Sequence, residues 1–90
     1  MCEILVVFEI ENELQRQEFI NKIKSLGSWG WARVLSNAYI VRSSNKTAVA
    51  IRDNLRINIK DSDRLFVVDI EDSDWASKNL PVEVNKWLKY

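Results

Sequence analysis

The carboxylate of Glu9 ends an apolar segment of strand length, and its type and position are suited to binding a metal ion. Two copies of such a carboxylate can meet across a two-fold axis and hold Mg²⁺ or Mn²⁺, which prefer hard oxygen ligands. A cation held there can activate water to cleave a phosphodiester. Glu9 is therefore the candidate catalytic and metal-binding residue. The residue types alone favour a simpler alternative, a solvated charge at the end of a strand.

A second candidate site is the aromatic segment WGW and the arginines that follow it. Trp29, Trp31 and Tyr39, near Arg33 and Arg42, can present an aromatic and basic surface on which single-stranded bases stack. The aromatic and glycine signature of RNA-recognition strands is absent from AYIVRS, however. The favoured alternative is that the two tryptophans pack beneath a terminal helix or across a dimer contact.

The balance of charges limits the kinds of partner that the chain can bind. Thirteen basic residues match thirteen acidic ones among 90 residues, which argues against a strongly basic nucleic-acid surface or a polybasic membrane anchor. The sequence has no histidine and one cysteine, Cys2. It therefore excludes histidine-based triads, cysteine–histidine zinc sites and an internal disulfide. Met1 leads directly into the first strand, and no apolar run approaches the roughly 20 residues that span a bilayer. A cytoplasmic protein that does not enter the membrane is expected.

Two similar apolar segments bracket the chain and predict strands. ILVVFEIE (4–11) returns as LFVVDIE (65–71), and both are rich in β-branched and aromatic residues. In the first segment the even positions are uniformly apolar, whereas the odd positions are apolar in the middle and charged at the ends. One face is therefore expected to face the core, and the other to be partly covered or covered by a partner. Asp69 takes the place of Glu9 in the second copy, toward the opposite end of an antiparallel sheet.

Two helices and a hairpin are expected between these strands. Asn12 and Gln15 can cap a first helix reciprocally, and this helix ends at Gly27 and has an apolar stripe of Leu14, Phe19, Ile20, Ile23 and Leu26. Ser36-Asn37 separates WGWARVL from AYIVRS as a hairpin turn. Thr47 can cap a second helix whose apolar face is formed by Ala48, Ile51, Leu55 and Ile59. This order predicts an α+β fold, a ferredoxin-like βαββαβ sandwich that has a four-stranded antiparallel sheet with both helices on one face.

The last residues are expected to form an extension. Residues 1–71 make the predicted ferredoxin-like domain, and residues 72–90 dock on the same or the partner subunit. Pro81 suits the first turn of an amphipathic C-terminal helix, which presents on one side Val84, Trp87 and Leu88. A chain this short buries only about 60 to 65 % of its unfolded surface, which favours a homodimer. The candidate partner-binding residues are Trp29, Trp75 and Trp87.

Three segments resemble the SinR-like branch of small ferredoxin-fold proteins: VVFEI, GSWGWARVLSNAYIV and IRDNLRINIKDSDRLFVVDI. This branch is similar to the small CRISPR adaptation protein and to the VapD ribonucleases. The resemblance spans about Ile4 to Ile70, and IRDNL followed by DSDRLFVV is its most specific part. In the wider superfamily the first strand typically ends in an aromatic residue and an aspartate, where this chain has Phe8 and Glu9. The resemblance implies a homodimer.

The first functional hypothesis is a homodimeric, CRISPR-adaptation-like or VapD-like protein with a metal-dependent endonuclease, endoribonuclease or nucleic-acid-binding role. Glu9 of each subunit would bind Mg or Mn. Ser62, Arg64 or Arg33 would position the phosphate. The nucleic-acid-binding candidates are Arg33, Arg42, Trp31, Ser62 and Arg64.

Two other hypotheses stay open. One is a non-enzymatic protein-interaction module, such as an antitoxin, an immunity protein or a phage defence-modulating protein. It would bind a protein partner through the open sheet face or through the region of Trp75 and Trp87. The other is binding of single-stranded RNA without cleavage, which would depend on Trp31 and on salt.

Overall fold

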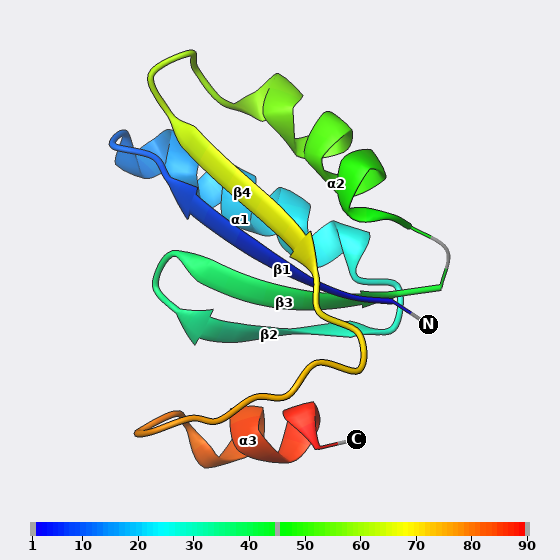
Figure 1. Ribbon diagram of the computed structural model, residues 1–90. Helices are drawn as coiled ribbons and strands as arrows, with labels where there is room; N and C mark the ends of the chain where they lie inside the picture. The colour runs from blue at the N-terminus through cyan, green and yellow to red at the C-terminus, as the bar shows by residue number, and fades with distance from the viewer. Residues whose placement is uncertain (1, 45, 90) are drawn as a thin grey trace.

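Strand β1 (Cys2–Glu9) lies inside a four-stranded antiparallel sheet, between two strands that are distant from it in sequence. The computed structural model describes residues 2–44 and 46–89. The sheet order is β2-β3-β1-β4 (Figure 1), so the predicted α+β, ferredoxin-like fold is confirmed. The other elements are α1 (Glu13–Leu26), β2 (Gly30–Leu35), β3 (Ala38–Ser43), α2 (Ala48–Leu55), the short 3₁₀ helix η1 (Arg56–Asn58), β4 (Arg64–Asp69) and α3 (Val82–Leu88).

Side-chain caps set where the two larger helices begin. The Asn12 side chain accepts a hydrogen bond from the Gln15 amide at 2.9 Å, and the Thr47 hydroxyl accepts one from the Ala50 amide at 3.2 Å. These bonds satisfy amides that have no partner within a helix. The predicted reciprocal half of the first cap is wrong, because the Gln15 side chain donates to the Asn58 carbonyl at 3.1 Å instead. That bond ties the start of α1 to the segment before β4.

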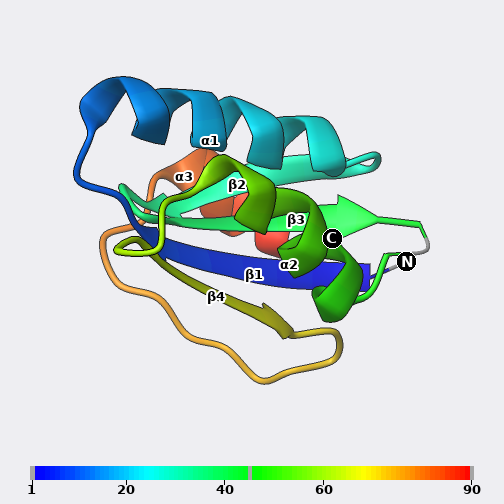
Figure 2. The same cartoon turned by 90° about the horizontal axis from the view of Figure 1, so that it is seen from above.

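Both α1 and α2 lie on one face of the sheet, where the core forms (Figure 2). Their buried residues pack against the even-numbered residues of β1 and against Tyr39 and Val41 of β3. α1 ends at Gly27, as predicted. Leu14, which was expected in the α1 stripe, is 72 % exposed. The reason is that Leu14 lies about 140° around the helix from Phe19.

The chain after β4 returns across the opposite face of the sheet. Residues 71–81, which we call the strap, cross this face near the start of β1 and lead to α3, which packs beside β2 (Figures 1 and 2). α3 therefore contacts its own chain in this structure. Its half-buried side contains the three residues that its amphipathic pattern predicts, Val84, Trp87 and Leu88. Within residues 2–44 and 46–89, no helix has the length and apolar character needed to cross a membrane.

The strap leaves the β1–β4 half of this face open. Val7 pairs with Phe66, and Leu5 with Val68, across the two strands. Phe66 is 63 % exposed, and Val7 and Val68 are half-buried. We call Val7, Phe66 and Val68 the uncovered strip. The predicted face, apolar in the middle and only partly covered, is thus confirmed.

Candidate functional site at the end of β1

Glu9 ends β1 on the same sheet face as the uncovered strip. Its register partner on β4 is Arg64, and Glu9 Oε1 lies 3.8 Å from Arg64 Nε. Both side chains are largely exposed, Glu9 at 73 % and Arg64 at 84 %. An ion pair this exposed is weak because water screens it. The Glu9 carboxylate can therefore exchange Arg64 for another cation.

A tight turn places Ser62 beside this ion pair. Asp63 accepts a hydrogen bond from the Lys60 amide at 2.9 Å, and the Asp63 amide donates to the Lys60 carbonyl at 3.0 Å. These bonds close the turn just before β4. Ser62, Glu9 and Arg64 then line one surface hollow of about 510 Å³. Three sequence candidates are therefore brought together here.

The main chain beneath Glu9 is well anchored although the side chain is exposed. The Phe8 amide donates to the Asn37 carbonyl at 3.1 Å, and Arg16 Nη1 of α1 donates to the Ile10 carbonyl at 2.9 Å. The Phe8 ring is buried in the core. Glu9 therefore projects from a fixed strand end, which is the kind of support that a functional side chain needs.

One subunit alone does not supply a complete cation site at Glu9. Among the described residues, the one cluster of three metal-ligating side chains lies at the other end of the sheet, where the ligand atoms of Cys2, Asp69 and Glu71 lie within 4.8 Å of one another. A turn accounts for part of this proximity, because Asp69 accepts a hydrogen bond from the Glu71 amide at 2.9 Å. The predicted separation of Asp69 from Glu9 is confirmed by the antiparallel register, which pairs Asp69 with Ile4. A metal at Glu9 would therefore need a ligand from a second copy.

Trp31 and Arg33 lie on the other sheet face, where the helices pack. They pair with Val41 and Tyr39 of β3, which belong to the core. Lys24 Nζ of α1 lies 4.5 Å from the centre of the Trp31 ring. The expectation that Trp31 packs beneath the C-terminal helix is wrong, because this register turns its side chain toward α1. The sheet separates Trp31 and Arg33 from the hollow at the end of β1.

Arg42 is buried beneath α3 instead of being displayed on the surface. It is 5 % exposed, and its guanidinium carbon lies 3.9 Å from the centre of the Trp87 ring. Arg42 Nη2 lies 3.5 Å from Glu3 Oε1, but Nε and Nη2 donate no hydrogen bond to any group in the described part of the chain. The ring and the carboxylate stabilise this cation. The predicted surface that joins Trp31 to Arg42 is therefore divided between the two faces of the sheet.

Gly30, between the two tryptophans of WGW, permits the docking of α3. Its φ of +119° is one that other residues rarely adopt, and a Cβ atom there would lie 3.3 Å from Trp87 Nε1. Trp29 is 63 % exposed, and its amide donates to the Arg42 carbonyl at 2.9 Å. Within one subunit, the glycine of WGW is thus the residue that lets α3 approach the sheet. The sequence signal for this role is a glycine inside a strand, which marks a close approach of another group.

The surface of α2 carries a further charge pair, away from the hollow at the end of β1. A hydrogen bond of 2.8 Å from Arg52 to Asp53 lowers the pKa of Asp53. Because the pKa of Asp53 is lower in the folded state than in the unfolded state, the pair stabilises the folded state at pH values above the unfolded pKa. This contribution is lost as pH falls through the folded pKa, and it is weak because both side chains are exposed.

Comparison with known proteins adds no family assignment. The chain matches no protein-family model, and a search of curated proteins finds no match. What the structure shows is a ferredoxin-like α+β fold with a four-stranded antiparallel sheet. Because one fold supports many functions, the function has to be argued from the site.

Proposed function

We propose that this chain is a homodimeric, SinR-like protein that binds nucleic acid and cleaves it with a divalent cation held between two Glu9 carboxylates, one from each copy. The observation that carries this proposal is the position of Glu9. It is exposed, and it directly follows the uncovered strip on the same face of the sheet. A two-fold contact through the strip would place both Glu9 side chains along one interface. The resemblance of VVFEI and DSDRLFVV to the SinR-like branch supports the same arrangement.

The uncovered strip supplies a driving force for the dimer. Fully burying an apolar side chain such as Phe66 contributes about 1.5 to 3 kcal/mol, and a two-fold contact buries the same residue in both copies. The charges of Glu9 and Arg64 border the strip. For two Glu9 carboxylates to hold one cation, the two-fold axis has to pass close to Glu9, and the cation then offsets the repulsion between them.

Glu11 and Asp63 line the hollow together with Glu9, so the site suits a phosphodiester substrate once a bound cation offsets these carboxylates. A cation bound by two carboxylates would polarise a phosphoryl oxygen and lower the pKa of bound water. The Arg64 guanidinium can donate two parallel hydrogen bonds to phosphate oxygens. Ser62, in the same hollow, adds a hydroxyl donor. Since the chain has no net charge and Arg64 is the one basic residue in the described lining of the hollow, we expect binding to be modest and to depend only weakly on salt.

Replacing Glu9 by glutamine is expected to abolish metal-dependent cleavage. The change keeps the size of the side chain but removes the charge that holds the cation. We expect cleavage to fall by more than about 100-fold, because the loss of a residue that only supports a metal ligand already costs up to about 100-fold. The assay is cleavage of labelled single-stranded RNA, single-stranded DNA and duplex DNA with Mg²⁺, Mn²⁺ or a chelator. Glu18→Gln on the exposed surface of α1 is the matched control and should cleave like the wild type.

Replacing Phe66 by aspartate is expected to convert the dimer to a monomer and to remove cleavage. The new charge would lie in the middle of the uncovered strip and would have to lose its water in the dimer. Light scattering coupled to size exclusion measures the mass directly. Ile57→Asp is the matched control, because Ile57 is 82 % exposed and lies on η1, outside the strip. A dimer that survives Phe66→Asp, or a wild type that is monomeric at all concentrations, would contradict the proposed interface.

The exposed ion pair between Glu9 and Arg64 favours a second candidate, a non-enzymatic protein-interaction module. In one subunit Arg64 lies 3.8 Å from Glu9, and the uncovered strip can serve a protein partner without any metal. This candidate applies if the wild type is folded but cleaves none of the substrates. It then requires a stable hetero-complex that survives Glu9→Gln and is lost in Phe66→Asp.

A further inference from the structure

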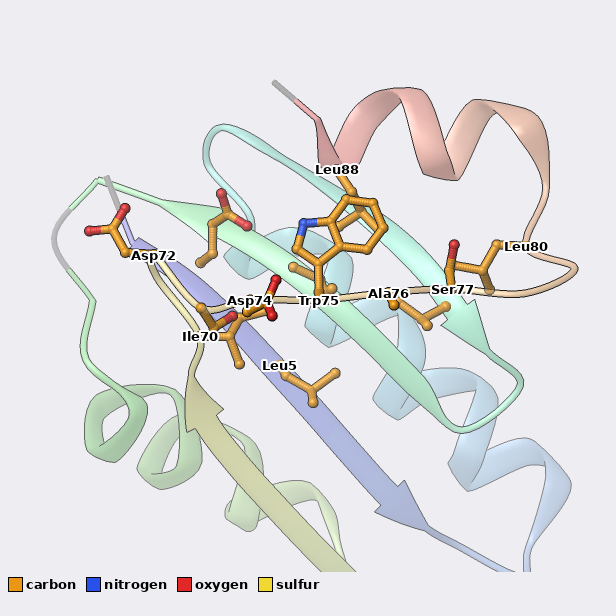
Figure 3. A pocket seen from close by; sticks show the side chains of 13 residues that line it. Leu5, Ile70, Asp72, Asp74, Trp75, Ala76, Ser77, Leu80 and Leu88 are labelled. Carbon is orange, nitrogen blue, oxygen red and sulfur yellow. The ribbon is translucent and has the colours of Figure 1, made fainter.

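The strap, α3 and the sheet enclose a pocket that is separate from the end of β1. Its volume is about 390 Å³, within the range of about 300 to 1,000 Å³ typical of small-molecule sites. Leu5 and Ile40 line it from the sheet, and Trp75 of the strap and Leu88 of α3 line it from the other side (Figure 3). Its interior is therefore apolar, and one of its walls is aromatic.

The charged residues at this pocket are all acidic. Glu3, Asp72 and Asp74 line it, and none of its described lining residues is a lysine or an arginine. Glu3 is partly neutralised by Arg42, which lies 3.5 Å away. Asp72 and Asp74 form no ion pair within the described part of the chain. The charge that no basic residue offsets is thus negative, and Asp72 and Asp74 of the strap carry it.

The strap is anchored near its start and again at Ser77, so the pocket beneath it is part of the fold. At its start, the Ile70 amide donates to the Glu3 carbonyl at 2.9 Å, and the Ser73 amide donates to the Ile70 carbonyl at 3.0 Å. Farther along, the Ser77 hydroxyl donates to the Asn85 side chain of α3 at 2.7 Å. Asp74 and Trp75 lie between these anchors (Figure 3).

We propose that this pocket binds a small amphipathic cation, an aliphatic or aromatic amine. Its apolar part would lie against Leu5 and Ile40, and its ammonium group would lie between the Trp75 ring and the Asp74 carboxylate. An ammonium group over an indole ring is attracted by the negative face of the ring, and the unpaired carboxylates add attraction that a neutral ligand lacks. A carboxylic acid of the same shape would be repelled. This site goes beyond the function proposed above, because neither Glu9 nor the uncovered strip takes part in it.

Three probes of one shape and different charge test the site: hexylammonium, hexan-1-ol and hexanoate. NMR titrations of the wild type are expected to show the tightest binding for hexylammonium and the weakest for hexanoate. The shifts should map to the Leu5 and Leu88 methyl groups and to the Trp75 indole. Equal affinity for the three probes, no shifts at any soluble concentration, or shifts centred elsewhere would overturn the proposal.

Two variants test whether hexylammonium binds in this pocket or responds only to the overall charge of the protein. Trp75→Leu and Asp74→Asn should each weaken hexylammonium binding about three- to fivefold, as expected for the loss of about 1 kcal/mol. Asp61→Asn is the matched control, because Asp61 is exposed in the turn before β4 and outside the pocket lining. An equal loss in Asp61→Asn would show that hexylammonium senses only the overall charge, and the proposal would fail. Neither pocket variant alters Glu9 or Phe66, so this result is independent of the cleavage assay.

Discussion

Replacing Phe8 by alanine is expected to lower the free energy of unfolding by about 3 to 5 kcal/mol. The Phe8 side chain is 2 % exposed, and its ring centre lies 5.1 Å from that of Phe19 and 6.2 Å from that of Tyr39. The variant loses the burial of the ring and leaves a cavity between β1, α1 and β3. Domains of this kind are stable by only about 5 to 15 kcal/mol. Urea unfolding followed by circular dichroism measures the difference.

Leu14→Ala provides the matched control for Phe8→Ala. It also truncates a large apolar side chain to alanine, but Leu14 is 72 % exposed on the outer side of α1. We expect a change within about 0.5 kcal/mol, as for most surface substitutions. A loss similar to that of Phe8→Ala would mean that α1 is rotated so that Leu14 faces the core. The observed packing of α1 would then be wrong.

The regular elements could be predicted because their patterns depend on local periodicity. Uniformly apolar even positions in β1 identify its core face without knowledge of any neighbour. The caps at Asn12 and Thr47 and the stop at Gly27 are equally local. The error at Leu14 came from grouping apolar residues without following their angular position around the helix.

The arrangement of the aromatic and basic residues could not be predicted, because a β-bulge decides it. Leu35 pairs with Ala38 next to the hairpin turn, and continuing that register would pair Arg33 with Ile40. The register shifts between Arg33 and Leu35 instead, and Arg33 pairs with Tyr39. One extra residue in a strand moves all residues beyond it to the opposite face.

The bulge separates Trp31 from Arg42. In an unbroken register these two residues would pair and share the open face, and the predicted aromatic and basic surface would form. With the shift, Trp31 pairs with Val41 and faces α1. Arg42 keeps its place on the open face and is covered by Trp87. No residue pattern in the sequence marks this bulge, so the two candidates could be assigned to their faces only from the structure.

Replacing Trp87 by alanine is expected to release α3 from the sheet while the rest of the fold stays intact. α3 has only seven residues, and a helix this short does not persist in water without tertiary contacts. Its Trp87 ring lies 3.9 Å from the Arg42 guanidinium and packs over Gly30. A desolvated contact between a cation and an aromatic ring is worth about 2 kcal/mol, in addition to the apolar area that the ring buries.

Hydrogen exchange measures this release residue by residue. In Trp87→Ala, protection should be lost at the amides of α3, for example Val84 and Asn85, whereas β1 and β3 stay protected. Trypsin should also cleave faster after Lys78 and Lys86. Trp29→Ala, which truncates a tryptophan that is 63 % exposed, should leave both measurements unchanged. Undiminished protection of α3 in Trp87→Ala would contradict the docking contact.

Replacing Arg42 then tests whether α3 is docked by the burial of the Trp87 ring or by the charge of Arg42. Arg42→Met keeps an apolar side chain beneath Trp87 and removes two buried donors that make no hydrogen bond within the described residues. The Glu3 side chain, which would lose its partner, is 25 % exposed and can be hydrated, so the variant leaves no fully buried unpaired charge. We therefore expect α3 to stay docked in Arg42→Met and to be released in Trp87→Ala. That result would show that burial of the Trp87 ring holds α3 in place. Release of α3 would expose more of the apolar sheet face that already includes Phe66. Trp87→Ala should for that reason also self-associate more strongly than the wild type.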